Sequence, residues 1–313
     1  MQTDSSVLFR SRVLFVSGKG GTGKTTVSAA LGRLAAAQGR RTLVLEVDAQ
    51  KPSLTACFGQ LPVYQPAEVE KNLSVSNIAW DEALGDWVEG MVAMRRLVRM
   101  IMKNRVVNLF LNVTPGARDL VVLWRITQLA AKYDTVIVDM PASGNAVAML
   151  AVPHTAERLF AAGPIRKCAD EILGLYSRAD TRVVLVAIPE EMVVNETVET
   201  VRKLRRELRD VHMPAVILNR ASIPTLTAAE RAILDGLGAA GLEGVAAELV
   251  EAGAWESRLE AATEEAQRRL FEEAALPVLM LPTLSRGQGA AKIVSQLTAA
   301  FARTSASHVE LRR

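Results

Sequence analysis

The sequence predicts an α/β fold: a doubly wound, mostly parallel sheet with helical insertions. Short β-branched runs alternate along the chain with longer helical patterns, and a glycine-rich loop joins the first run to a helix. The runs are near-continuous in Val, Ile and Leu, as in strands that helices cover on both faces. Strands that alternate with helices build a parallel sheet, which sets the fold class.

Six runs are expected to form strands, at residues 13–17, 42–48, 135–139, 182–188, 215–219 and 277–281. The stretches that follow the second and fifth runs are longer than a simple crossover needs. We therefore expect one domain over residues 1–313, with helical insertions at about 81–131 and 225–275.

Composition restricts the class of protein and its location. Half of the 313 residues are apolar and 23% are charged, too apolar for a disordered chain and too evenly charged for a membrane channel. The net charge of +3 does not by itself indicate a nucleic-acid or membrane partner. A signal-peptide pattern and an apolar stretch of about 18 residues are both missing from the sequence, so we expect a cytoplasmic protein.

The glycine-rich loop fits the phosphate-binding pattern G-x-x-x-x-G-K-[ST]. It reads Gly18-Lys19-Gly20-Gly21-Thr22-Gly23-Lys24-Thr25-Thr26. Backbone without Cβ curls tightly enough for successive N–H groups to point at one phosphate, and the following helix adds the positive end of its dipole. Lys24 is expected to bridge the β- and γ-phosphates, and the Thr25 hydroxyl to ligate Mg²⁺. The sequence therefore predicts a P-loop nucleotide site.

The second lysine of the loop points to a particular family. Lys19 is not needed to cradle phosphate, but Gly18 to Thr26 resembles the deviant Walker A loop of the arsenite-pump (ArsA-like) and tail-anchored-protein targeting ATPases, which is shared with MinD/ParA and nitrogenase iron protein. In that group the extra lysine reaches across a dimer to the partner's phosphates. The resemblance, which covers most of residues 12–300, implies a dimeric ATPase in which Lys19 and Lys24 are catalytic.

Two carboxylates lie close together near the end of the second predicted strand. Side chains alternate along a strand, so Glu46 and Asp48 share one face, and Asp48 is nearer the carboxyl end where ligands bind. Asp48 resembles the family's first-switch Asp, which positions the attacking water, although the loop reads Asp48-Ala49-Gln50-Lys51-Pro52 instead of D-P-A-H. We expect Asp48 to orient the water, with Glu46 as the alternative.

The third predicted strand ends in Asp139 at the same edge of the sheet. A Walker B Asp at this place holds a Mg²⁺-bound water, and Asp139 is expected to do so. The following residues, Met140-Pro141-Ala142-Ser143-Gly144-Asn145, resemble the second switch D-x-P-x-[ST]-G-H, with Asn145 in place of His.

The nucleotide base is expected to be adenine. Asn219 ends the fifth predicted strand, where the resemblance implies an adenine-contacting Asn. The GTPase tetrad N-K-x-D is missing, because Arg220-Ala221-Ser222 follows. We therefore expect ATP and Mg²⁺ as cofactors.

The partner is less well specified. Cys57 and Cys168 alone build neither the arsenite-binding cysteine cluster nor a Cys-x-x-Cys zinc clamp. Residues 88–112 combine Met91, Met94, Met100 and Met102 with several cations, which suits an adaptable surface for a hydrophobic protein client or a membrane-associated partner, or else a core stripe. The resemblance implies either a homodimer or a heterodimer with a paralogous ATPase subunit.

Two functions follow from these features. We expect an ATPase that couples ATP binding and hydrolysis to the conformational handling of a hydrophobic protein or membrane partner. The alternative is a MinD/ParA-like positioning switch acting on DNA or membrane, for which the DNA patch would be Arg202, Arg205, Arg206 and Arg209 on one helix face. We do not favour nucleic acid as the partner.

Overall fold

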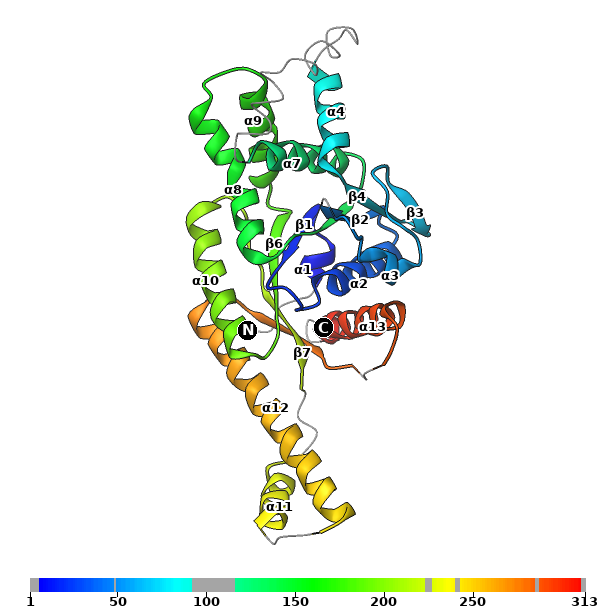
Figure 1. Ribbon diagram of the computed structural model, residues 1–313, viewed down its shortest axis with the longest axis vertical. Coiled ribbons are helices and arrows are strands. Elements are labelled where there is room, and N and C mark those ends of the chain that lie inside the picture. Colours follow the sequence, from blue (N-terminus) through cyan, green and yellow to red (C-terminus); the bar gives the residue numbers. More distant parts are fainter. Residues whose placement is uncertain are drawn as a thin grey trace.

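An eight-stranded sheet forms the centre of the molecule, with strand order β3-β4-β2-β5-β1-β6-β7-β8 (Figure 1). The structure is a computed structural model that describes residues 6–47, 49–91, 116–222, 227–239, 243–284 and 287–310. Every neighbouring pair is parallel except β3 and β4, which are antiparallel. The prediction of a doubly wound, mostly parallel sheet is therefore confirmed.

The strands are β1 (Val13–Ser17), β2 (Thr42–Val47), β3 (Ala67–Glu70), β4 (Leu73–Ile78), β5 (Thr135–Asp139), β6 (Thr181–Ala187), β7 (Val216–Ala221) and β8 (Val278–Pro282). All six expected strands are present, with bounds within two residues of the predicted ones. Sequence reasoning missed β3 and β4. The first is polar at every second position, and the second mixes Ser and Asn with apolar residues, so neither has the continuous apolar content used to find the others.

Helices cover both faces of the sheet, as the doubly wound fold requires. The helices are α1 (Ser6–Phe9), α2 (Lys24–Ala37), α3 (Leu54–Phe58), α4 (Trp80–Met91), α7 (Ala117–Ala130), α8 (Ser143–Leu159), α9 (Pro164–Tyr176), α10 (Glu191–Glu207), α11 (Ala228–Ala239), α12 (Val245–Glu273) and α13 (Ala290–Glu310). One face packs against α4, α7, α8, α9 and α10, and the other against α1, α2, α3 and α13.

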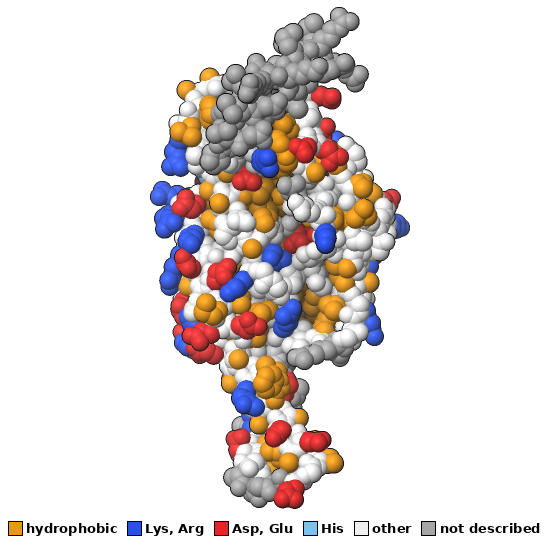
Figure 2. All heavy atoms as spheres, viewed as in Figure 1, with side chains coloured by type: hydrophobic (Ala, Val, Ile, Leu, Met, Phe, Trp, Pro, Cys, Tyr) orange, Lys and Arg blue, Asp and Glu red, His pale blue; other side chains and the backbone are white. Residues whose placement is uncertain are grey.

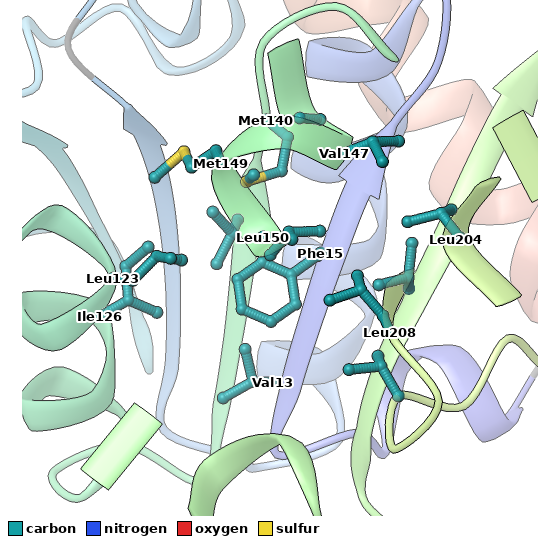
Figure 3. Packing of buried hydrophobic residues seen from close by; sticks show 14 of the residues in the cluster. Val13, Phe15, Leu123, Ile126, Met140, Val147, Met149, Leu150, Leu204 and Leu208 are labelled. Atoms are coloured by element: carbon teal, nitrogen blue, oxygen red, sulfur yellow. The ribbon is translucent and has the colours of Figure 1, made fainter. Parts of the chain in front are cut away.

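The central strand β1 shows how alternation builds two cores. Val13 and Phe15 belong to the cluster beneath α7, α8 and α10, whereas Leu14 and Val16 belong to the cluster beneath α2 and α13. Figure 3 shows the Phe15 ring beside Leu150 of α8. All four β1 side chains are fully buried, so β1 is held in the middle of the sheet and its carboxyl end fixes the start of the phosphate loop.

The two expected helical insertions contain helices. The described part of the first holds α7 and all but the first residue of α4, and the second holds α11 and α12. In Figure 1, α12 extends beyond the body of the molecule, and α11 packs against its outer part. Of the predicted Met-rich surface, residues 92–112 and the side chain of Met91 lie outside the described residues.

In the part of the chain that the structure describes, no helix has both the length and the hydropathy that crossing a membrane would require.

Close packing of α2 on β2 predicts a stability effect at Gly32. A Cβ at this position would lie 2.3 Å from Cγ2 of Val44, a stiff side chain in the sheet. We expect Gly32→Ala to lower the free energy of unfolding by about 1–2 kcal/mol, because the clash outweighs the better helix propensity of Ala. Urea unfolding measures the change.

Gly85→Ala in α4 is the matched control, because a Cβ there meets no atom within 4 Å. It should leave the stability unchanged or raise it by up to about 1 kcal/mol. Equal effects of the two substitutions would contradict the packing argument.

Candidate functional site

The phosphate loop lies between the end of β1 and the start of α2, and two of its glycines are required by close contacts. Gly18 has φ 144°, and a Cβ there would lie 2.2 Å from the carbonyl oxygen of Val186 in β6. Gly23 adopts a left-handed conformation with φ 91° directly before α2, and its Cβ would lie 2.6 Å from Nδ2 of Asn219. The loop is thus curled as its sequence predicts, with the N-terminus of α2 at its base.

The remaining loop residues differ in their exposure to solvent. Gly20 and Gly21 are exposed, and the buried Thr22 hydroxyl donates to the carbonyl of Lys19 at 2.9 Å. Thr26, in the first turn of α2, lines a cavity beside the loop.

The two lysines of the loop point to different partners. Nζ of Lys24 donates to the carbonyl oxygen of Lys19 at 3.3 Å, and burial lowers the Lys24 pKa, opposed by Asp139 and Glu196. Nζ of Lys19 instead lies 3.4 Å from Oε2 of Glu196 in α10. Lys24 is therefore placed within its own loop, whereas Lys19 is directed to a helix outside it.

Thr25 and Asp139 meet across the sheet edge. The Thr25 hydroxyl donates to Oδ2 of Asp139 at 2.5 Å. Asp139 is 7% exposed, and burial raises its pKa to about 7, with the neighbouring Glu46 adding to the rise. Its other oxygen, Oδ1, is buried and has no hydrogen-bond partner among the described residues.

These oxygens fit a Mg²⁺ site. Mg²⁺ prefers oxygen ligands and is usually bound through one or two carboxylates together with substrate phosphates. The site offers a carboxylate with one buried oxygen left over, beside a hydroxyl at the mouth of a phosphate loop. The predicted metal-site residues Thr25 and Asp139 are therefore brought together by the fold.

Glu46 is engaged in holding α3. Its two carboxylate oxygens accept from the backbone N–H groups of Ser53 at 2.7 Å and Leu54 at 3.2 Å, at the start of α3. Glu46 is 4% exposed, and burial raises its pKa although these two hydrogen bonds act in the opposite direction. Each oxygen thus accepts one backbone N–H, which gives Glu46 a structural role at the start of α3.

Asp48, the preferred candidate for that role, lies outside the described residues. The residue after it is fixed by Asn77 at the end of β4. The Asn77 side chain accepts from the backbone N–H of Ala49 at 3.1 Å and donates to its carbonyl at 2.8 Å. Sequence reasoning missed Asn77, because β4 itself was not recognised.

The predicted second switch is tied to the phosphate loop. The backbone N–H of Ser143 donates to the carbonyl of Gly18 at 3.2 Å, and the Ser17 hydroxyl donates to the carbonyl of Pro141 at 3.1 Å. The Ser143 hydroxyl also donates to Oε1 of Glu196, whose other oxygen pairs with Lys19. Glu196 therefore links the switch to the extra lysine, a role that no sequence spacing indicated.

Asn219 lies beside the phosphate loop. Its Nδ2 donates to the carbonyl of Thr22 at 2.8 Å, and its side chain lines the cavity that adjoins Gly23 and Thr26. An amide has two N–H donors and one acceptor oxygen, so one N–H and the oxygen remain for a ligand after this bond. The next residue, Arg220, donates from Nη2 to the carbonyl of Gly21 at 3.1 Å.

The two cysteines are buried on different helices. Cys57 lies in α3 and Cys168 in α9, and burial raises the pKa of both thiols, to about 11 and about 12. High pKa values and burial make them poor nucleophiles and poor metal ligands.

A strand–loop–helix phosphate motif with a carboxylate at the end of the neighbouring parallel strand defines a P-loop NTPase fold. The sequence profile of the family described as "Anion-transporting ATPase" matches residues 11–175, just over half of the chain. The chain belongs to this ArsA ATPase family, which confirms the resemblance found in the sequence. Membership of an ATPase family also supports the prediction that the protein is an ATP hydrolase.

Individual relatives are distant. ATPase BagA of Mycobacterium tuberculosis is 27% identical over 223 residues, which cover 67% of this chain and 65% of BagA. An uncharacterized protein of Streptomyces coelicolor is 34% identical over 154 residues, or 47% of this chain and 38% of that protein. ATPase ASNA1 homolog 1 of Paramecium tetraurelia is 25% identical over 147 residues, which cover 46% of this chain and 44% of that protein. The match thus spans less than two thirds of the length of each of these relatives.

The position of Glu46 predicts a structural effect. We expect Glu46→Gln to lower the free energy of unfolding by about 1–2 kcal/mol, because an amide has one acceptor oxygen for the two backbone donors at the start of α3. Urea unfolding at pH 7 measures it. Glu68→Gln on the exposed side of β3 is the matched control, and a loss no larger than that of the control would show that Glu46 does not hold α3.

Proposed function

We propose that this chain is a Mg²⁺-dependent ATPase that works as a dimer and couples ATP binding and hydrolysis to the conformational handling of a hydrophobic protein or membrane partner. The observation that carries the ATPase part is the meeting of Thr25 and Asp139 at the mouth of the phosphate loop, with Oδ1 of Asp139 buried and unpaired among the described residues. Asn219 beside the loop, and the missing N-K-x-D tetrad, support ATP rather than GTP.

The residues divide the chemistry of hydrolysis among them. Backbone N–H groups of the loop and of the first turn of α2 bind the phosphates, and Lys24 stabilises charge on the β- and γ-phosphates. Thr25 would ligate Mg²⁺ and Asp139 would hold it through a bound water, and the ion would supply positive charge to the phosphates. Asp48 orients the attacking water, because it is nearer than Glu46 to the carboxyl end of the strand, where ligands bind.

Lys19 supports the dimeric part of the proposal. Its ammonium group is directed to Glu196 in α10 rather than into its own loop. Two nucleotides that face each other across a dimer bring like-charged phosphates close together, and a cation from the partner chain reduces that repulsion. Release from Glu196 would let Lys19 take this role, with either a second copy or a paralogous subunit as the partner.

An apolar groove supports the hydrophobic partner. A cavity of 390 Å³ lies between α7, α8 and α9 and is lined by Leu120, Val152, Leu159, Phe160 and Ile165. Leu159 is 71% exposed at its edge, so an apolar segment of a client would bury surface that water now covers. Trp87 and Gly116 also line the groove.

Two of the four arginines of the alternative DNA-binding surface make contacts within the protein. Arg206 pairs with Glu207 at 3.1 Å, and Arg205 donates to the carbonyl of Ala275 at 3.2 Å. Figure 2 shows acidic side chains interspersed with basic ones along the edge where α10 lies. A surface of mixed charge is a poor ligand for a phosphate backbone, so the positioning switch on DNA is the less favoured proposal.

Lys24 tests the ATPase assignment. We expect Lys24→Ala to abolish Mg²⁺-dependent ATP hydrolysis, and Asp139→Asn to lower both turnover and the response to Mg²⁺, with the fold intact by circular dichroism. Phosphate release measures turnover. Lys71→Ala, an exposed lysine in the turn between β3 and β4, is the control and should hydrolyse ATP at the wild-type rate. Near-wild-type turnover of Lys24→Ala would overturn the assignment.

Lys19 tests the dimer. We expect specific activity to rise with protein concentration, or on addition of a paralogous subunit, and Lys19→Ala to remove this rise while nucleotide binding survives. Glu196→Gln should keep the rise, because it loosens the contact that holds Lys19 in the free chain. Sedimentation with a slowly hydrolysed ATP analogue checks assembly directly. A fully active monomer at every concentration would contradict the proposal.

A further inference from the structure

One wall of the cavity beside the phosphate loop comes from α12, and neither the loop motif nor the fold class gives this wall a function. The cavity measures 460 Å³ and begins at Gly23 and Thr26 of the loop and α2. Asn219 and residues 282–284, at the ends of β7 and β8, form its floor, and Trp255 and Leu259 of α12 close the side toward the helical protrusion. Apolar side chains in orange lie where this protrusion joins the body (Figure 2).

The position of the cavity matches the place of a nucleotide base. In open α/β sheets, ligands bind beyond the carboxyl ends of the strands, and this cavity lies there, next to the loop that holds phosphates. Most of its lining is apolar, with a few polar groups such as the Asn219 amide, which is the usual make-up of a small-molecule site. A flat, largely apolar purine with hydrogen-bonding edges suits such a lining.

Trp255 is the large aromatic side chain of this wall, and it is 56% exposed. The guanidinium of Arg258 lies over its ring, 5.5 Å from the centroid. More than half of the indole surface therefore remains in contact with water, and a second aromatic ring could bury part of it. A base entering the cavity would supply that contact.

Hydrogen bonds join α12, which carries Trp255, to the segment that follows Asn219. Ser222, three residues after Asn219, donates through its backbone N–H to Oγ1 of Thr263 at 3.0 Å. The Ser222 hydroxyl donates to Oε1 of Glu256 at 2.5 Å. Trp255 is therefore placed by direct bonds between α12 and the segment that follows Asn219, so its position depends on the strand that carries the base-side amide.

We propose that Trp255 stacks on the base of the bound nucleotide and is a further base-binding residue of this site, so that α12 helps to hold the base. The inference rests on the proposed function, since it needs a nucleotide in the loop. Stacking on an aromatic ring tolerates different bases because every base has a π-face. Trp255 therefore selects for the presence of a base, and Asn219 selects which base it is.

The test compares a ligand that has a base with one that lacks it. Binding of ADP and of inorganic tripolyphosphate, each with Mg²⁺, is measured by calorimetry for the full chain and for Trp255→Ala, Trp255→Phe and Leu249→Ala. We expect Trp255→Ala to bind ADP about tenfold more weakly, with GDP weakened by the same factor and tripolyphosphate unchanged. Trp255→Phe keeps a ring and should lose less than about threefold. Leu249 is the matched control, an exposed side chain of α12 that does not line the cavity.

Fluorescence gives a second readout. The chain contains Trp80, Trp87 and Trp124 besides Trp255, so we expect ADP to change the tryptophan emission of the wild type and not that of Trp255→Phe. Unchanged ADP affinity of Trp255→Ala would overturn the inference, as would equal weakening of ADP and tripolyphosphate. A wild-type chain that binds neither ligand would overturn the proposed function itself, and the inference with it.

Discussion

The hydrogen bond between Thr25 and Asp139 joins the two parts of the site that come from distant stretches of chain. It ties the first turn of α2 to the end of β5, the strand that pairs with β1. The bond leaves one buried carboxylate oxygen without a partner among the described residues, and the Asp139 pKa of about 7 reports how unfavourable that environment is for the charge.

Around this bond, each remaining element of the site is fixed by a contact to the loop or to a strand end. Ser143 of the second switch donates to the backbone of Gly18, and Asn77 holds the residue that follows Asp48. Glu196 contacts both Ser143 and Lys19, so one carboxylate joins the segment after β5 to the extra lysine of the loop.

The sequence alone predicted those parts of the fold and site that depend on residues close together in the chain. The six buried strands, the curled loop and Asp139 at the end of a strand all follow from apolar runs and from motif spacing. The pairing of β3 with β4, the use of Glu46 to hold α3, and the link from Glu196 to Lys19 do not follow. They depend on which backbone and side-chain groups meet after long stretches of chain have folded back, and a single sequence has no period or spacing that encodes such meetings. The wall formed by Trp255 is another such case, because α12 is joined to the segment after Asn219 by hydrogen bonds from Ser222 to Glu256 and Thr263.

The central claim is that the Thr25–Asp139 pair and the phosphate loop together form one site for a metal–nucleotide complex. Calorimetric titration of ATP into the wild-type chain, with and without Mg²⁺, tests it most directly. We expect one ATP bound per chain, with a dissociation constant at least about tenfold lower when Mg²⁺ is present. Binding of equal strength with and without Mg²⁺, or a titration that shows no binding in either condition, would contradict it.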